Sequence, residues 1–194
     1  MSNAVIRFVN SNDAARLAEI YSYFVNNTAI SFEYIAPDKA EFENRIASIF
    51  PHYPFIVYEI DNKVVGYAYG HRYLERAAYR WDAELSIYID KDYHGQKIGK
   101  ALYGAVIDLL RAMNFQTVYG IVTSPNPKSE HLHNSMGFRN SGVMKKSGYK
   151  LGKWYDITNF ELAIGEYPDT PSEPVSALQI PEEVVSEIFK KYSI

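Results

Sequence analysis

Residues 81–103, WDAELSIYIDKDYHGQKIGKALY, are the stretch around which we expect the fold to be built. Apolar and polar side chains alternate over 83–89, and this period of two predicts a strand with one face against a core. The chain is then polar up to Gln96, and apolar residues return at helical spacing from Ile98. Gly99 lies in the first turn of that helix, where the absent side chain lets a ligand approach the backbone. Unpaired amides and the positive end of the helix dipole attract phosphate, so the stretch predicts a strand, a phosphate-binding turn and a helix.

The composition indicates a single folded domain without a strong overall charge. With 194 residues, 47% of them hydrophobic, the chain can bury a sizeable core. The formal net charge of −3 supplies no basic field, which argues against nucleic acid as a partner. The absence of cysteine excludes disulfides, thiolate metal sites and a cysteine nucleophile, and it fits a reducing compartment. No stretch reaches the roughly 18 apolar residues of a membrane-spanning helix, so we expect a cytoplasmic protein with no membrane contact. We also expect no bound metal.

The order of predicted elements is strand, two helices, three strands, helix, strand, helix and two strands. This order indicates an α/β domain with a mixed sheet. We expect the last strand pair at 141–145 and 155–164, around a glycine-containing loop. The composition then shifts, so we assign 1–165 to the domain and 166–194 to a proline-rich linker and a short amphipathic helix.

Three separated segments carry a family resemblance. They are IYI at 87–89 with HGQKIG at 94–99, NPKS at 126–129 with LH at 132–133 and GF at 137–138, and GYKLGKWYD at 148–156. Each is weak evidence alone, but their order is specific. Over about residues 5–164 the chain resembles the GNAT superfamily of acyl-CoA-dependent N-acyltransferases, and within it the phosphinothricin acetyltransferase branch. The resemblance implies a mostly antiparallel central sheet flanked by helices.

The sequence departs from the family pattern at three positions. His94 occupies the usual Gln or Arg position of the phosphate loop, and Lys97 replaces the first loop glycine, so Gly99 alone remains of the glycine pair. We expect Lys97 to add a cation while its amide still points inward. Asp82 stands where threonine is common, which leaves the acceptor's identity open.

Acetyl-CoA is the co-substrate that the resemblance implies. We expect its pyrophosphate on the amides of 95–100 and its pantetheine along 87–89. Asn126 taken alone is a turn residue before Pro127, and the resemblance makes it a cofactor contact. The expected cofactor-binding residues are Ile87, Tyr88, Ile89, Gly95, Gln96, Lys97, Ile98, Gly99, Lys100 and Asn126.

Acetyl transfer to an amine needs a neutral amine, a polarised thioester carbonyl and a proton for the departing thiolate. Glu84 lies inside the predicted strand, where a carboxylate is costly unless it is paired or lines a cleft. An ion pair with a neighbouring arginine such as Arg80 is one interpretation, and a general base acting through water is the other. The resemblance favours the base. His133 occupies the superfamily's tyrosine position, which makes it either the general acid or a structural histidine.

Three residues before the central strand are either solvated loop residues or part of the acceptor site. In the resembled branch, the matching positions line the acceptor site, and a guanidinium binds a substrate carboxylate through two parallel hydrogen bonds. Phe32 is either a wall of that pocket or a core residue. The expected substrate-binding residues are Phe32, Arg76, Tyr79 and Arg80.

The resemblance therefore implies an N-acetyltransferase that acts on the α-amine of a small amino acid or analogue, of the phosphinothricin or methionine sulfone type. The alternatives are acetylation of a peptide N-terminus or an aminoglycoside, and a non-catalytic module that only binds acyl-CoA. We also expect a homodimer, because the resembled branch commonly forms one and because the chain holds 17 tyrosines.

Overall fold

The structure is a computed structural model, and it describes residues 4–193. Residues 1–3 of the expected domain and residue 194 of the expected tail lie outside the described part. The strands and helices, in chain order, are β1 (Ala4–Phe8), α1 (Ala14–Asn27), α2 (Lys39–Ile49), β2 (Phe55–Ile60), β3 (Lys63–Arg72), β4 (Asp82–Ile89), α3 (Ile98–Ala112), β5 (Thr117–Ser124), α4 (Pro127–Ser135), β6 (Arg139–Lys150), β7 (Lys153–Ala163) and α5 (Glu182–Tyr192). Short 3-10 turns cover Ser11–Asp13, Ala77–Tyr79, Lys91–Tyr93 and Ala177–Gln179.

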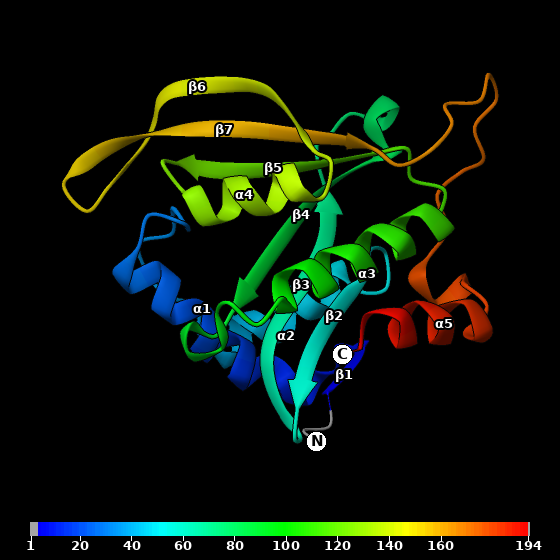
Figure 1. The fold of residues 1–194 in the computed structure, drawn as a ribbon, viewed down its shortest axis with the longest axis horizontal. Coiled ribbons are helices and arrows are strands. Elements are labelled where there is room, and N and C mark those ends of the chain that lie inside the picture. Colours follow the sequence, from blue (N-terminus) through cyan, green and yellow to red (C-terminus); the bar gives the residue numbers. More distant parts are fainter. Residues whose placement is uncertain (1–3, 194) are drawn as a thin grey trace.

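A seven-stranded sheet, in the order β1-β2-β3-β4-β5-β7-β6, forms the centre of the fold. Its neighbouring strands are antiparallel except β4 and β5, so the expected mixed, mostly antiparallel α/β domain is confirmed. The parallel pairing is short, running from Asp82 opposite Thr117 to Glu84 opposite Tyr119. Beyond it β4 and β5 diverge (Figure 1), while β5 continues its pairing with β7. The sheet is therefore split open after Glu84.

Helices cover both faces of the sheet and enclose two hydrophobic clusters. On one face α1 and α2 pack over β2 and β3, and Asp38 caps α2 by accepting a hydrogen bond from the Glu41 amide. On the other face α3 packs across β2, β3 and β4. Strand β4 alternates between these faces: Ala83 and Leu85 belong to the α3 cluster, and Tyr88 packs on the ring of Tyr21 from α1.

Helix α3 is the most deeply buried helix of the described part, and this burial fixes its start beside the opening between β4 and β5. Leu102, Val106 and Leu109 have no exposed surface. Truncating a leucine at such a position costs about 2–5 kcal/mol, because a cavity is left behind. The N-terminus of α3 is thus held by its apolar stripe, as the helical spacing predicts. No helix within residues 4–193 is long and apolar enough to cross a bilayer.

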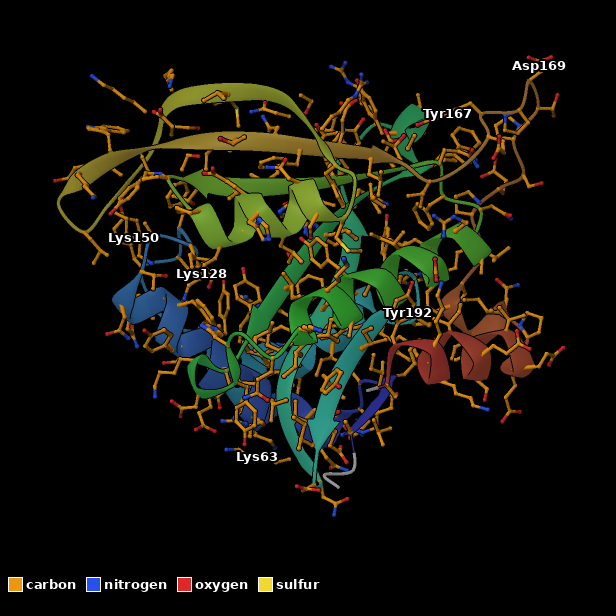
Figure 2. All side chains as sticks on the ribbon, viewed as in Figure 1. Lys63, Lys128, Lys150, Tyr167, Asp169 and Tyr192 are labelled. Atoms are coloured by element: carbon orange, nitrogen blue, oxygen red, sulfur yellow. The ribbon has the colours of Figure 1, made fainter. Side chains whose placement is uncertain are left out.

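The segment after β7 folds back onto the domain. Ala177, Ile180 and Ile188 are buried in the same cluster as α3. The ring of Tyr192, labelled in Figure 2, lies over Gly104, where an added Cβ would come within 2.4 Å of it. Tyr192 Oη also donates a 2.8 Å hydrogen bond to Asp108. The expected short helix is α5, and it completes the core on the α3 face.

Strand β6 is longer than the sequence predicts. It passes through Gly148 to Lys150, with register shifts between Asn140 and Gly142 and between Met144 and Gly148. These irregularities interrupt the alternating pattern on which the prediction rests. The tip of the hairpin is the tight turn at Leu151 and Gly152, which have φ angles of 50° and 78°.

Candidate active site

The opening between β4 and β5 is bordered by the start of α3 and by α4. Gly99 faces this space: an added Cβ would lie 3.3 Å from Ile89 Cδ1, 3.6 Å from Leu132 Cδ2 and 3.8 Å from Ile87 Cδ1. A side chain at position 99 would therefore fill the groove between strand and helices. Ile87 and Ile89 thus lie beside Gly99, whereas the side chain of Tyr88 packs on the opposite face, against Tyr21 of α1.

The turn before α3 presents backbone amides at this opening. The amides of Lys100 and Ala101 both donate to the Lys97 carbonyl, so those of Ile98 and Gly99 precede the first helical hydrogen bonds. Lys97 has a φ of 64°, in the left-handed region that glycine adopts most easily. The backbone of a glycine-type loop is thus kept, with a cationic side chain added. His94 Nε2 donates to the Ile89 carbonyl at 3.0 Å, which ties the loop to the end of β4.

Asn126 closes the far side of the opening as the N-cap of α4. Its side-chain oxygen accepts from the Ser129 amide at 3.3 Å, so the turn interpretation holds for the fold. The residue also lines a cavity of about 510 Å³ that lies between the end of β5, the start of α4 and the segment after α1. Thr28, Ile30, Thr123, Lys128 and Tyr155 contribute to the same walls.

Glu84 is the last residue of β4 that pairs with β5, on the edge of the opening. Its side chain is 20% exposed, and among residues 4–193 it has no arginine or lysine partner. The ion pair with Arg80 that the sequence left open is absent, because Arg80 bonds to Glu173 at 2.9 Å instead. Burial raises the pKa of Glu84 to about 7. A carboxyl with this pKa is partly ionised at neutral pH and suits a general base.

His71 is a neighbour of Glu84 that the sequence analysis missed. The register of β3 and β4 places the two residues opposite each other, and His71 Nε2 lies 3.7 Å from Glu84 Oε1. His71 stands in an ordinary β-rich run, so no local pattern distinguishes it. Only the cross-strand pairing brings it to the site.

His133 is buried on the opposite side of the opening and is 1% exposed. Its Nδ1 donates to the Ser129 carbonyl at 2.8 Å, so Nε2 accepts the hydrogen bond from Tyr103 Oη at 3.2 Å. Burial lowers the pKa of His133 and raises that of Tyr103, so both groups are neutral at pH 7. Gly120 leaves room for the imidazole, since a Cβ there would lie 2.2 Å from Nε2. Tyr103 was missed because it lies on the buried stripe of α3.

The expected acceptor residues before β4 differ in whether their side chains are free or paired within the chain. The guanidinium of Arg76 is exposed and has no hydrogen bond or ion pair within the described chain, and Tyr79 is 38% exposed. The Arg80 guanidinium, in contrast, is held by Glu173 and lies over the Trp81 ring at 5.3 Å. Arg76 is therefore the arginine of this loop that is available to a ligand.

Phe32 is a partly buried residue of the α1–α2 loop, and the β6–β7 hairpin holds it. Its ring lies directly against Gly148, where a Cβ would approach to 2.2 Å, and 6.5 Å from the Tyr155 ring. Lys150, seen where the hairpin meets this loop (Figure 2), is buried and donates from Nζ to the carbonyls of Val25 and Ser31, both at 2.6 Å. The GYKLGKWYD segment thus anchors the loop that carries Phe32.

Residues 6–158 match the family model described as acetyltransferase (GNAT) domain. The chain belongs to the GNAT acetyltransferase family. The resemblance seen in the sequence is confirmed.

Several characterised GNAT proteins are similar to this chain. It is 35% identical to a phosphinothricin N-acetyltransferase of Alcaligenes faecalis over 153 residues, covering 78% of each chain. It is 30% identical to an L-methionine sulfoximine/L-methionine sulfone acetyltransferase of Salmonella typhimurium, covering 84% of this chain and 95% of that protein. The fold matches the crystal structure of a phosphinothricin acetyltransferase from Sinorhizobium meliloti in complex with AcCoA, with a TM-score of 0.85, 32% identity and coverage of 89% and 95%.

Proposed function

We propose that this GNAT enzyme transfers the acetyl group of acetyl-CoA to the α-amine of a small amino acid or amino-acid analogue, of the phosphinothricin or methionine sulfone type. The observation that carries the proposal is Glu84: a half-buried carboxyl with a pKa of about 7, without an arginine or lysine partner among residues 4–193, at the edge of an opening that is bordered by the start of α3. The names of the relatives support the acceptor class. A module that only binds acyl-CoA has no use for such a carboxyl.

The start of α3 fits an anionic co-substrate, because free amides, the helix dipole and two lysines converge there. We propose that the turn at 95–100 holds the pyrophosphate, chiefly through the amides of Ile98 and Gly99, and that the 87–89 edge of β4 and Asn126 bind the pantetheine. When bound, acetyl-CoA supplies the activated acetyl group as a thioester. The narrow approach at Gly99 supports this placement.

Glu84 then removes the proton of the acceptor ammonium, directly or through one water, and the neutral amine can attack the thioester carbonyl. An α-amine has a pKa of about 7.7–8.0, so a base with a pKa of about 7 is sufficient. For the thiolate, we propose that His133 is the general acid: the Nε2–H bond of its protonated ring breaks, the S–H bond forms, and the ring returns to the neutral form that accepts from Tyr103 Oη. A thiol pKa near 8.5 makes this protonation helpful without being compulsory.

We propose that Arg76 binds the acceptor's carboxylate and that Phe32 and Tyr79 border the acceptor. The free guanidinium of Arg76 supports this role, because a guanidinium binds a carboxylate through two parallel hydrogen bonds. Arg80 would join only if it left Glu173. Arg76→Ala is accordingly expected to raise acceptor KM, with Arg80→Ala giving the smaller change.

We further propose a cytoplasmic homodimer. Exposed apolar side chains gather on the β6–β7 hairpin and the adjoining α1–α2 loop, and a second copy would cover them. They are Tyr34, Ile35, Val143, Met144, Tyr149, Leu151 and Trp154. Light scattering at micromolar concentration is expected to give twice the 22.2 kDa chain mass, and a clean monomer would reject the dimer.

The function is tested by measuring free thiol release from acetyl-CoA with a panel of acceptors. Phosphinothricin, methionine sulfone and methionine sulfoximine are expected to be turned over, with free amino acids next. Peptides and aminoglycosides serve as the competing classes. Turnover of these two classes alone would contradict the proposed acceptor, and acetyl-CoA binding without release with any amine would support the binding module.

A further inference from the structure

We propose that His71 is a positioning residue that acts through Glu84: it takes up the proton that Glu84 removes from the acceptor amine and passes it to the cavity beside α2. The inference rests on the proposed function, because it takes Glu84 to be the base. It assigns a role to a side chain that belongs to neither hydrophobic cluster.

The hydrogen bonds of His71 set the direction of its two ring nitrogens. Nδ1 lies 3.2 Å from the Arg72 carbonyl, and a carbonyl can only accept, so Nδ1 carries the proton of the neutral ring. Nε2 is then the unprotonated nitrogen. It accepts a hydrogen bond from Ser86 Oγ at 3.4 Å and lies 3.7 Å from Glu84 Oε1. The nitrogen that could receive a proton therefore lies beside both the Ser86 hydroxyl and the proposed base.

A cavity of about 480 Å³ connects His71 to the surface. His71, Tyr69, Arg72 and Glu75 line one side of it, and His52 and Tyr53 line the end next to α2. Glu84 is not among the lining residues. The side chain of His71 is 30% exposed, against 20% for Glu84. His71 thus stands between the base and this solvent-filled space.

The proton balance of the relay is simple. The O–H bond of protonated Glu84 breaks and an N–H bond forms at Nε2, which regenerates the carboxylate and leaves an imidazolium. The imidazolium then gives one proton to water or buffer in the cavity. The 3.7 Å separation must shorten by about 0.5–1 Å for direct transfer, and catalytic hydrogen bonds commonly tighten once substrate is bound.

The surroundings favour exchange between the two groups. Burial raises the pKa of Glu84 to about 7 and lowers that of His71, so a proton received by His71 is readily released to solvent. The charges nearest in the cavity, Arg72 and Glu75, are paired with each other at 3.1 Å. The other titratable groups around the pair are Tyr69 on β3, Tyr73 just after β3, Asp82 on β4, Tyr103 on α3, Tyr119 on β5, and His52 and Tyr53 after α2.

The experiment measures kcat of His71→Gln and His71→Ala with both substrates saturating, over a series of imidazole concentrations. Without imidazole we expect kcat to fall about tenfold or more, with the acetyl-CoA KM unchanged. Added imidazole is expected to restore kcat in proportion to its concentration, most strongly in His71→Ala, where the lost ring leaves room for it. His52→Gln is the matched control, because His52 lines the same cavity and has no contact with Glu84. The His52→Gln variant is expected to keep wild-type kcat, and its kcat is expected not to change with imidazole concentration.

Wild-type kcat in both His71 variants would overturn the relay. So would a loss of kcat that no imidazole concentration reverses in either variant, since a purely structural role predicts that result. Glu84→Gln is measured in the same series to separate this inference from the proposed function. Full activity of Glu84→Gln would contradict the assignment of Glu84 as the base. An inactive Glu84→Gln variant together with fully active His71 variants would contradict the relay alone.

Discussion

At the scale of single residues, two glycines leave the space that the active site uses. Gly99 keeps the groove between β4, α3 and α4 open, and Gly120 makes room for the buried His133 ring. Neither has a positive φ, so close approach and not backbone conformation requires them. The role of each glycine can be tested by a substitution that adds a side chain at that position.

Gly99→Glu is expected to abolish acetyl-CoA binding. The added carboxylate fills the groove next to Ile89 and places a negative charge where phosphate would bind. Calorimetry with acetyl-CoA measures the change. Gly99→Ala is the matched control, because its Cβ makes a tight contact of 3.3 Å with the flexible end of Ile89 and carries no charge, and it should retain weakened binding. Unchanged affinity in a folded Gly99→Glu variant would place the co-substrate elsewhere.

Gly120→Ala is expected to displace His133 and to lower kcat by about 10²-fold or less, because its methyl group would lie 2.2 Å from Nε2. His133→Ala should give a similar loss, with acetyl-CoA affinity nearly intact in both. The double variant tests the cause. Once the ring is absent the added methyl should cost nothing more, and fully additive losses would show that Gly120 acts independently of His133.

At the scale of elements, the β6–β7 hairpin holds the acceptor loop. Lys150 bridges the carbonyl of Val25, near the end of α1, and that of Ser31, next to Phe32. Tyr34 Oη adds a hydrogen bond to the Tyr149 carbonyl. A buried ammonium is stable here because two carbonyls replace its water, although burial still lowers its pKa.

Lys150→Met is expected to raise acceptor KM several-fold and to leave acetyl-CoA affinity unchanged. The substitution leaves two carbonyls without their partner, which costs about 1–3 kcal/mol and frees the loop that carries Phe32. Steady-state kinetics and thermal unfolding measure both effects. Lys153→Met is the control, because Lys153 is exposed on the same hairpin. Equal acceptor KM in the two variants would contradict a role in holding the loop.

Local periodicity predicts β4 and α3 well, because both elements show one clean pattern, and it places Gly99 at the helix start. It misses the extension of β6 to Lys150, where register shifts break the alternation. It also misses His71 and Tyr103. Their positions at the site depend on the β3–β4 register and on the packing of α3 against α4, which are long-range contacts without a local signature.

At the scale of the whole molecule, the chain after β7 closes the core on the α3 face. Hydrogen bonds from Val175 to the Met113 carbonyl and from Ala177 to the Pro51 carbonyl lead the chain to α5. The apolar side of α5 packs beside α3 and β1 (Figure 1), and the Ser193 hydroxyl accepts a hydrogen bond from the Ile6 amide. The two ends of the described chain are thus joined.

Tyr192→Ala is expected to lower stability by about 1–3 kcal/mol. It removes the ring that fills the space over Gly104 and the hydrogen bond to Asp108. Denaturant unfolding followed by circular dichroism measures the change. Leu178→Ala, at a side chain that is 65% exposed on the same segment, should have little effect. A Tyr192→Ala variant as stable as wild type would show that the contact with α3 contributes nothing.

The most direct test of the account is the pH dependence of kcat for wild type and Glu84→Gln with the best acceptor. A base acts in its ionised form, so wild-type kcat should rise with pH through the Glu84 pKa of about 7 and then level off. Glu84→Gln keeps the shape of the side chain, so we expect acetyl-CoA affinity to be unchanged, kcat to fall by about 10² to 10⁴-fold, and the inflection near 7 to disappear. Wild-type turnover with the same inflection in Glu84→Gln would contradict the account.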